Sequence, residues 1–313
     1  MDNQFQAFDS RCKFGGKYFP SPIFTASGCA GSGKELSQFF DLDELGAVVT
    51  KSISVKPRSG RATPRMAETP SGMLNSIGLQ GPGIDQFLAE DIPWLIAHNA
   101  RVIVSISGET IEEYSSLARK LRGVAGISGI EVNISCPNVE NRGMVFACDP
   151  VASRAVVESV RRNVGGELPI IVKLSPDVTD IVSIAGEVIS AGADGLALIN
   201  TLLGMAIDID AMRPKLAGKT GGLSGPAIRP VAVRAIYQVH AAFKNTPILG
   251  MGGVTSGRDA LELIMAGASA ISVGTANFGD PTAVTRIKKE LIELLKERKF
   301  NSVAAAVGVA HEK

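Results

Sequence analysis

The chain has 313 residues, of which 45% are hydrophobic and 20% are charged, so it can bury a large core and is not an intrinsically disordered protein. Its 32 basic and 31 acidic side chains give a formal charge of +1, without the basic excess that marks nucleic-acid-binding proteins. No apolar run is long enough to span a membrane, and the polar amino terminus lacks a signal-peptide core, so we expect a cytoplasmic protein.

Short runs rich in valine, isoleucine and leucine alternate along the chain with longer amphipathic runs. Eight short runs have the apolar character of parallel strands that are buried on both faces, and they cover residues 23–26, 47–53, 101–107, 129–135, 170–174, 195–200, 247–250 and 270–274. The amphipathic runs predict helices over residues 111–122, 151–163, 179–191, 228–243, 258–266 and 282–296. Gly192 and Gly267 each lie where a helix ends just before a strand.

Eight such β/α units predict an α/β fold, a (β/α)8 TIM barrel that residues 1–313 form as one domain, since no linker separates a second one. The alternative is a doubly wound open sheet, because alternation of strands and helices does not prove that the sheet closes. Two connections, residues 54–83 and 201–229, are too long for simple turns. Long loops in a compact domain are usually functional, so we expect both to lie over the carboxyl-terminal face of the barrel.

In a TIM barrel, the residues that directly follow each strand line the active site. In this chain they are polar residues and glycines: Ser27, Gly28, Lys51, Ser52, Ser105, Asn133, Cys136, Lys173, Asn200, Thr201, Gly252, Gly253, Gly274 and Thr275. Lys51 and Lys173 are the strongest evidence for a binding site, because a buried ammonium group needs an anion or an electron-rich partner. The alternative is that each lysine reaches solvent or pairs with a carboxylate.

The strand over residues 129–135 is followed by a thiol. Apolar Ile130, Val132 and Ile134 alternate there with polar residues, and Pro137 ends the strand because proline has no backbone donor. Cys136 therefore lies between the carboxamides of Asn133 and Asn138, which suit a planar polar ligand, while the thiol can take up or release a proton. The alternative is a buried cysteine that acts only as a small hydrophobic residue.

Glycine-rich loops follow the last two predicted strands, at residues 250–253 and 273–275. In TIM barrels the corresponding loops often bind a phosphate through backbone N–H groups, and residues 221–225 add another flexible loop. Residues 28–35 nearly fit a P-loop, but Glu35 replaces the serine or threonine that holds magnesium, which argues against nucleotide hydrolysis. The four scattered cysteines and three scattered histidines indicate neither a zinc nor an iron–sulfur site, so we expect no metal.

Over nearly its whole length, the chain resembles the class 1 dihydroorotate dehydrogenases, FMN-dependent barrels of pyrimidine biosynthesis. The resemblance rests on the residues at 50–52, 75–79, 133–138, 172–175, 199–201, 221–227, 250–253 and 273–278. Residues 221–227 and 274–278 are most similar to the 1B subgroup, whose members pass electrons to NAD through a second subunit that carries FAD and a 2Fe–2S cluster. The resemblance implies a central homodimer of this chain with one such subunit on each side.

The resemblance also implies roles for individual residues. Cys136 would remove the proton from C5 of dihydroorotate while a hydride leaves C6 for the flavin. Lys51 would lie between flavin and substrate, and Lys173 would face the pyrimidine edge of the flavin, where reduction places negative charge. The implied substrate contacts are Lys51, Asn75, Ser76, Ile77, Gly78, Leu79, Asn133, Asn138, Asn200 and Thr201.

The implied FMN contacts come from almost every strand end. They are Ser27, Gly28, Lys51, Ser52, Ser105, Asn133, Lys173, Ile199, Gly225, Gly252, Gly253, Gly274 and Thr275. Ser105 stands where relatives often carry asparagine, which leaves its contact with the flavin open. Three alternatives remain: a fumarate-using homodimer of the 1A type, an enzyme similar to dihydropyrimidine dehydrogenase, and a flavin-binding barrel without catalysis. Intact Cys136 and Lys173 argue against the last one.

Overall fold

The computed structural model describes residues 8–135, 146–166 and 168–311. In these ranges, the central sheet has eight parallel strands: β3 (Ile23–Thr25), β4 (Val48–Val49), β7 (Val102–Ile106), β8 (Ile127–Asn133), β9 (Ile170–Lys173), β10 (Gly195–Leu198), β15 (Ile248–Gly250) and β16 (Ala270–Val273). Their order is β3-β16-β15-β10-β9-β8-β7-β4. Across the remaining gap, Gly46 N–H donates to Ile23 O at 2.8 Å and Thr25 N–H donates to Ala47 O at 3.2 Å. These bonds close the sheet into a (β/α)8 barrel, as predicted, and exclude the open sheet.

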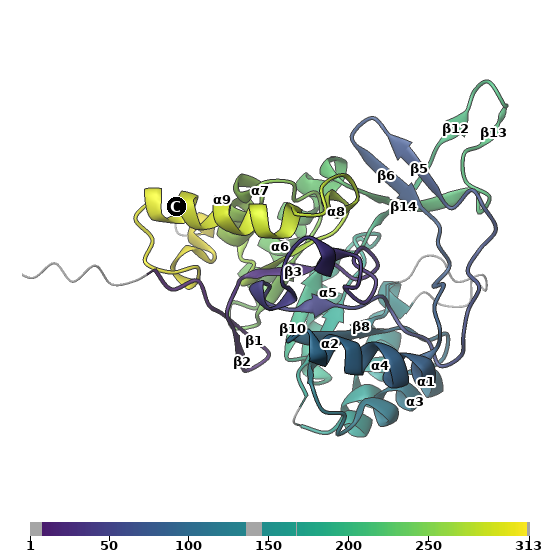
Figure 1. Ribbon diagram of the computed structural model, residues 1–313, viewed down its shortest axis with the longest axis horizontal. Helices are drawn as coiled ribbons and strands as arrows, with labels where there is room; N and C mark the ends of the chain where they lie inside the picture. Colours follow the sequence, from purple (N-terminus) through teal and green to yellow (C-terminus); the bar gives the residue numbers. More distant parts are fainter. Residues whose placement is uncertain (1–7, 136–145, 167, 312–313) are drawn as a thin grey trace, which may run out of the picture.

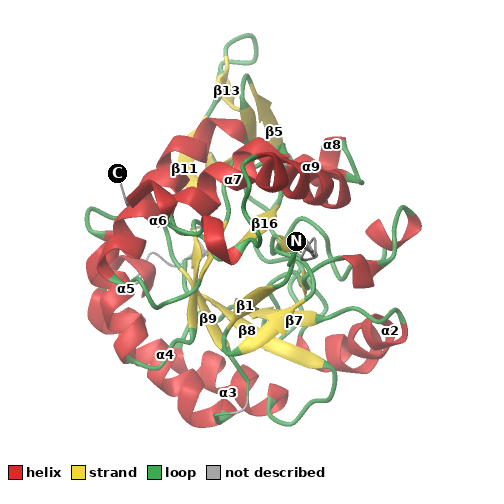
Figure 2. Ribbon diagram, turned by 90° about the vertical axis from the view of Figure 1, so that its left-hand side faces the viewer, coloured by secondary structure: helices red, strands yellow, loops and turns green. Residues whose placement is uncertain are grey.

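The predicted helices surround the strands (Figure 2). They are α3 (Ile111–Leu121), α4 (Pro150–Val164), α5 (Ile181–Ser190), α6 (Arg229–Ala242), α7 (Gly257–Ala266) and α9 (Ala283–Glu297). Side chains at the N-caps Thr110, Asp149, Asp180 and Ser256 accept hydrogen bonds from first-turn N–H groups, which explains where α3, α4, α5 and α7 begin. Short 3₁₀ turns cover Leu36–Gln38, Leu42–Glu44, Phe146–Cys148, Pro226–Ile228, Ala304–Ala306 and Val309–His311.

Two helical segments were not predicted. One is the short helix α8 (Ala276–Gly279). The other runs through α1 (Ile84–Gln86), the π-helical turn η3 (Phe87–Asp91) and α2 (Ile92–Ala97). Its buried residues Ile84, Phe87, Ile92 and Leu95 are spaced by three, five and three positions, because the π-turn widens the middle interval. This spacing departs from the 3.6-residue period that identifies a helix in sequence.

The barrel interior is apolar near the amino ends of the strands. Inner-face residues such as Phe24, Ile103, Ile171 and Leu249 pack there with Phe14 from the hairpin of β1 (Cys12–Phe14) and β2 (Lys17–Phe19). The outer faces of the strands pack against the helices in a second, larger core. Burial on both faces accounts for the nearly continuous apolar runs in the sequence.

The two long connections form a second sheet together (Figure 1). The first contributes β5 (Met66–Thr69) and β6 (Gly72–Asn75), and the second contributes β11 (Leu202–Met205) and β14 (Thr220–Ser224). They pair antiparallel in the order β11-β14-β6-β5, with Leu223 opposite Leu74. The hairpin of β12 (Ile207–Asp208) and β13 (Arg213–Pro214) extends beyond this sheet.

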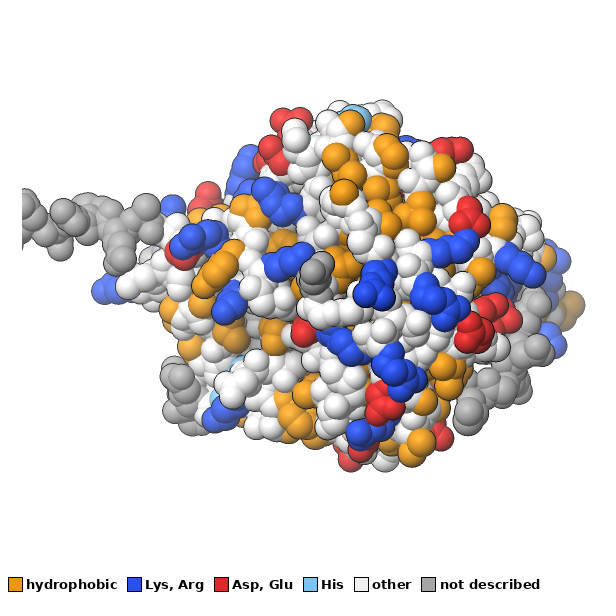
Figure 3. Space-filling model, turned by 90° about the horizontal axis from the view of Figure 1, so that it is seen from below, with side chains coloured by type: hydrophobic (Ala, Val, Ile, Leu, Met, Phe, Trp, Pro, Cys, Tyr) orange, Lys and Arg blue, Asp and Glu red, His pale blue; other side chains and the backbone are white. Residues whose placement is uncertain are grey.

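The face of the molecule that Figure 3 shows carries side chains of both charges. On the face seen from below Figure 1, where α2, α3 and α4 lie, lysine and arginine side chains are interspersed with acidic and hydrophobic ones (Figure 3). Among the residues that the structure describes, no helix is both long enough and apolar enough to cross a membrane.

The closure of the barrel generates a stability prediction. A Cβ atom on Gly46 would lie 2.1 Å from Phe24 Cε1 and 2.3 Å from the Ser21 carbonyl oxygen. We therefore expect Gly46→Ala to lower the free energy of unfolding by about 2 to 3 kcal/mol, measured by urea denaturation. Gly166→Ala is the control, because its Cβ would have no neighbour within 4 Å among the described residues. Equal midpoints for the two variants would contradict the importance of this contact.

Candidate active site

Two adjoining cavities open at the carboxyl ends of the barrel strands, each with a volume of about 260 Å³. Lining residues common to both are Ser27, Cys29, Lys173, Asn200, Thr201, Ser224 and Thr275. The first cavity also contains Ile199, Gly225, Gly252, Gly253 and Gly274. The second also contains Gly28, Lys51, Ser52, Asn75, Ile77, Gly78, Leu79 and Asn133. The two long connections thus reach the carboxyl-terminal face of the barrel, as predicted.

Four predicted site residues are not among these lining residues. Cys136 and Asn138 lie outside the described residues. Ser76 is fully buried, and its hydroxyl has no hydrogen-bond partner within the described ranges. Ser105 is also fully buried. It does not line a cavity itself, but its hydroxyl lies 2.9 Å from that of Ser52, which does. Any effect of Ser105 on a ligand therefore passes through Ser52.

The end of β8 holds two carboxamides in fixed orientations. Asn133 Nδ2 donates to Ser52 Oγ at 3.0 Å, and Asn133 Oδ1 accepts the Ser135 N–H and hydroxyl at 3.3 and 3.2 Å. Asn200 Nδ2 donates to Ser135 Oγ at 2.6 Å. From α3, the Tyr114 hydroxyl donates to the Asn133 carbonyl at 2.8 Å and anchors the strand end. The carboxamides are therefore preorganised before a ligand arrives.

Two lysines bring positive charge to the cavities. Lys173 is 5% exposed and lies opposite Asn133 in the β8–β9 register, so it does not extend into solvent. Lys51 lies near the loop after β3, where a Cβ on Gly28 would be 3.8 Å from its Nζ. Burial raises the pKa of the nearby Cys29 thiol, while the charges of Lys173 and Lys51 lower it by a smaller amount. The net effect is a neutral thiol beside two cations.

The glycine loops after β15 and β16 present backbone donors to the first cavity. Gly252 and Gly253 have φ values of +123° and +73°, which favour glycine. Within the described residues, the N–H groups of Gly252, Gly253 and Thr275 donate to no protein acceptor. The Thr275 hydroxyl donates to Ser224 Oγ at 2.8 Å and ties this loop to β14. Converging free N–H groups are suited to binding an anion such as a phosphate.

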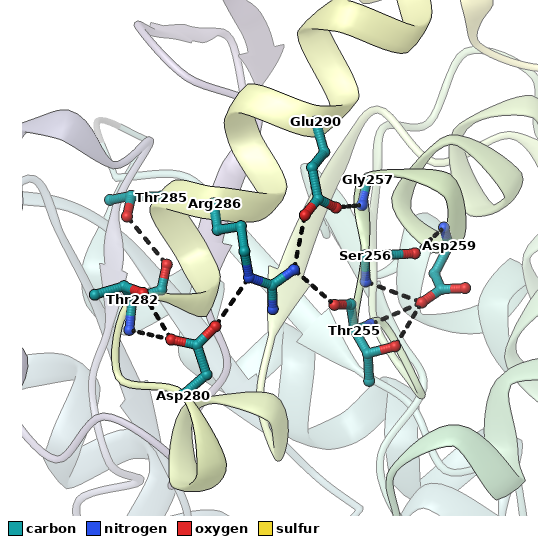
Figure 4. Close-up of polar contacts among 9 residues, drawn as sticks. All are labelled: Thr255, Ser256, Gly257, Asp259, Asp280, Thr282, Thr285, Arg286 and Glu290. Carbon is teal, nitrogen blue, oxygen red and sulfur yellow. Dashed lines mark hydrogen bonds and ion pairs between the residues drawn. The ribbon is translucent and has the colours of Figure 1, made fainter.

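A polar network holds these two loops together (Figure 4). Arg286 of α9 donates to Asp280, to Glu290 and to the Thr255 carbonyl at 2.9, 2.8 and 3.3 Å. Asp259 accepts the N–H groups of Thr255 and Ser256 at 2.9 and 3.0 Å. Burial raises the pKa of Asp259, but hydrogen bonds from Thr255 and Ser256 and the charge of Arg229 outweigh it, so the pKa is lowered. The carboxylate thus remains an acceptor that fixes the loop.

Several lining residues were missed by the sequence reasoning: Cys29, Met66, Met73, Ser224, Thr255 and Phe278. Cys29 follows Ser27 in the same loop, so the rule that strand-end residues line the site could have included it. Met66 and Met73 reach the cavity only because β6 pairs with β14 and β5 pairs with β6, which no local pattern indicates. Within the near P-loop, Lys34 has a structural role, since it pairs with Asp91 at 2.7 Å.

Comparisons with known proteins agree with this geometry. A family model described as dihydroorotate dehydrogenase matches residues 10–295. Three similar proteins are each named dihydroorotate dehydrogenase B (NAD(+)), catalytic subunit. The protein of Geobacter sp. (strain M21) is 52% identical over 288 residues, which cover 92% of this chain and 93% of the relative.

The other two relatives are similarly close. The protein of Desulforudis audaxviator is 49% identical over 93% of this chain and 94% of its own. That of Pelobacter propionicus is 49% identical over 96% and 98%, respectively. Together with the family model, these matches establish that the chain belongs to the dihydroorotate dehydrogenase family, as its motifs predicted.

Proposed function

We propose that the chain is the catalytic subunit of an NAD-linked dihydroorotate dehydrogenase, which oxidises (S)-dihydroorotate to orotate in cytoplasmic pyrimidine biosynthesis. The observation that carries this proposal is the convergence of Lys51, Lys173 and three asparagine side chains at one cavity, in a chain that is 52% identical to a named catalytic subunit. Residues 1–313 act as a single FMN-binding barrel in this proposal.

The cavity residues fit FMN as the cofactor. The free N–H groups of Gly252, Gly253 and Thr275 suit its phosphate, and the buried Lys173 ammonium suits a ring that gains negative charge on reduction. When bound, FMN supplies the acceptor for the hydride of the substrate. The other expected contacts are Ser27, Gly28, Lys51, Ser52, Asn133, Ile199, Gly225 and Gly274, with Ser105 acting through Ser52.

The second cavity suits dihydroorotate, a six-membered ring with amide edges and a carboxylate. The carboxamides of Asn75, Asn133 and Asn200 lie at this cavity and suit such edges, and Lys51 offers a cation to the carboxylate. We include Thr201, the segment of residues 76–79 and Asn138 in the proposed substrate site on the strength of the family motif. These residues orient the ring, so that its C5 proton lies within reach of the base.

We assign the role of base to Cys136, which directly follows Ser135 at the end of β8. A free thiol is partly ionised near neutral pH and can remove a proton without a histidine partner. The rival is Cys29, which lines both cavities. Burial is the main influence on the Cys29 thiol and raises its pKa, so Cys29 is the weaker candidate.

The first prediction concerns Cys136. We expect Cys136→Ser to slow flavin reduction by dihydroorotate at least about 100-fold while FMN stays bound, because no base activates the new hydroxyl. Anaerobic stopped-flow absorbance measures the rate in a single turnover. Cys148→Ser, the same change at an exposed thiol, is the control. A near-normal rate in Cys136→Ser, or a larger loss in Cys29→Ala, would reject Cys136 as the base.

The second prediction concerns Lys173. We expect Lys173→Ala to weaken FMN binding and to make the midpoint potential of bound FMN more negative by about 30 to 60 mV, because a cation near the reduced ring is lost. Redox titration with a reference dye measures this potential. Lys244→Ala, in the loop between α6 and β15 at the opposite end of the barrel, is the control. An unchanged midpoint potential would contradict an electrostatic role for Lys173 and leave it only a packing contact.

We further propose that the chain needs a partner subunit to reduce NAD. The relatives are named as catalytic subunits, and this sequence has no G-x-G-x-x-G motif and no cysteine spacing for an iron–sulfur cluster. Apolar side chains are exposed on β11–β13: Leu203, Met205, Ile207, Ile209 and Met212, the last 87% exposed. Such a surface is suited to a protein interface. The proposed assembly is a homodimer with an FAD and 2Fe–2S subunit on each side.

The third prediction tests this dependence on a partner. With dihydroorotate as substrate, the purified chain alone should reduce an artificial dye but form almost no NADH. NADH absorbance and dye bleaching are measured in parallel, with fumarate as the third acceptor. Rapid NADH formation by the lone chain would contradict the partner, and efficient use of fumarate would favour the 1A type instead.

A further inference from the structure

A glutamate is buried inside the barrel without any role in the proposed reaction. Glu131 lies on β8, two residues before Asn133, and none of its surface is exposed. Its Oε1 accepts a hydrogen bond, but its Oε2 has no partner within the described residues. A buried, half-satisfied carboxyl group costs stability, and an apolar side chain of similar volume would be expected to pack better. A buried carboxyl group at this position therefore suggests a function other than stability.

A chain of three hydroxyl groups leads from Glu131 to the cavity. The Ser105 hydroxyl donates to Glu131 Oε1 at 2.8 Å. Ser105 Oγ lies 2.9 Å from Ser52 Oγ, which in turn lies 3.1 Å from Ser27 Oγ. Ser27 lines both cavities, while Ser105 and Glu131 are fully buried behind the wall.

The carboxylate determines the direction of every hydrogen bond in this chain. A hydroxyl has one hydrogen, and that of Ser105 is committed to Glu131, so Ser105 Oγ must accept from Ser52. The hydrogen of Ser52 is then also committed, and Ser52 Oγ accepts from Asn133 Nδ2 at 3.0 Å and from Ser27. The hydrogen of Ser27 therefore points into the wall, and its oxygen presents lone pairs to the cavity.

We propose that Glu131 is a positioning residue for the cofactor, which acts through Ser105 and Ser52 to make Ser27 a hydrogen-bond acceptor toward the cavity. This inference rests on the proposed function, in which FMN occupies the site. The pyrimidine edge of FMN has an N–H group between two carbonyls. An acceptor at Ser27 beside donors such as Lys173 complements that edge, whereas a wall of donors alone would oppose the N–H group.

Substitution of the Glu131 carboxylate should reverse the direction of the hydrogen bonds between the three serine hydroxyl groups. In Glu131→Met the side-chain volume is nearly kept but the inner acceptor is lost, so Ser105 is free to donate to Ser52 and Ser52 to Ser27. The hydrogen of Ser27 would then point into the cavity and meet the N–H group of the ring. We expect FMN to bind about 10-fold more weakly, and Glu131→Gln, which keeps an acceptor oxygen for Ser105, to remain within about 3-fold of the unmodified chain.

The decisive experiment is a double-mutant cycle on FMN binding to the full-length apoprotein, followed by quenching of FMN fluorescence. We expect Ser27→Ala and Glu131→Met each to weaken binding, and the double variant to bind no more than about 3-fold more weakly than the worse single variant, since Glu131 acts only through Ser27. Effects that multiply, to about 100-fold in the double variant, would overturn the proposal.

Two further variants keep the test decisive. If Glu131→Met does not fold, Ser105→Ala takes its place in the cycle, because it breaks the same chain one bond later. Ser115→Ala removes a buried serine–serine hydrogen bond between α3 and α4, away from the cavities, and should leave FMN binding within about 2-fold. A chain that takes up no FMN even without substitutions would contradict the proposed cofactor itself, which separates that failure from a failure of the cycle.

Discussion

Backbone hydrogen bonds from Gly46 and Thr25 join β3 to β4, and through this seam the barrel closes. Closure places the carboxyl ends of all the parallel strands around one opening, so that residues from Ser27 to Thr275 meet although they are far apart in sequence. It also determines where the long connections end. Because both leave the same rim of the barrel, β6 and β14 can pair, and the sheet they form walls the second cavity.

The barrel interior is apolar near the amino ends of the strands and polar near their carboxyl ends. The apolar layer contributes stability, and the polar layer forms the candidate site. Near the amino ends, Phe14, Phe24 and Ile171 fill the centre as an apolar core. Two residues beyond Ile171 on the same inner face, Lys173 replaces apolar packing with charge. Such buried polar groups are destabilising unless they are paired, and they are typically concentrated at functional sites. The apolar layer below offsets the unfavourable burial of the polar layer above.

Much of the fold and many candidate site residues could be predicted from local sequence. Strands that are buried on both faces appear in the sequence as continuous apolar runs. Many of the residues that follow these strands are polar although they are buried or half-buried. The remainder depends on contacts between distant segments. The π-turn at Phe87–Asp91 distorts the helical period, and the pairing of β6 with β14 has no local signal. Glu131 alternates with apolar neighbours as a solvent-facing residue would, yet it faces the barrel interior. Its link to Ser105 follows from the strand register, which sequence does not specify.

The proposed function requires this barrel to bind FMN and to use it to oxidise dihydroorotate. The most direct measurement is the visible absorption spectrum of the purified, FMN-loaded chain before and after anaerobic addition of dihydroorotate, with orotate measured in the same sample. We expect the flavin absorption to bleach within one turnover and one orotate to form per bound FMN. A spectrum that dihydroorotate leaves unchanged, in a chain that has bound FMN, would contradict the proposed function.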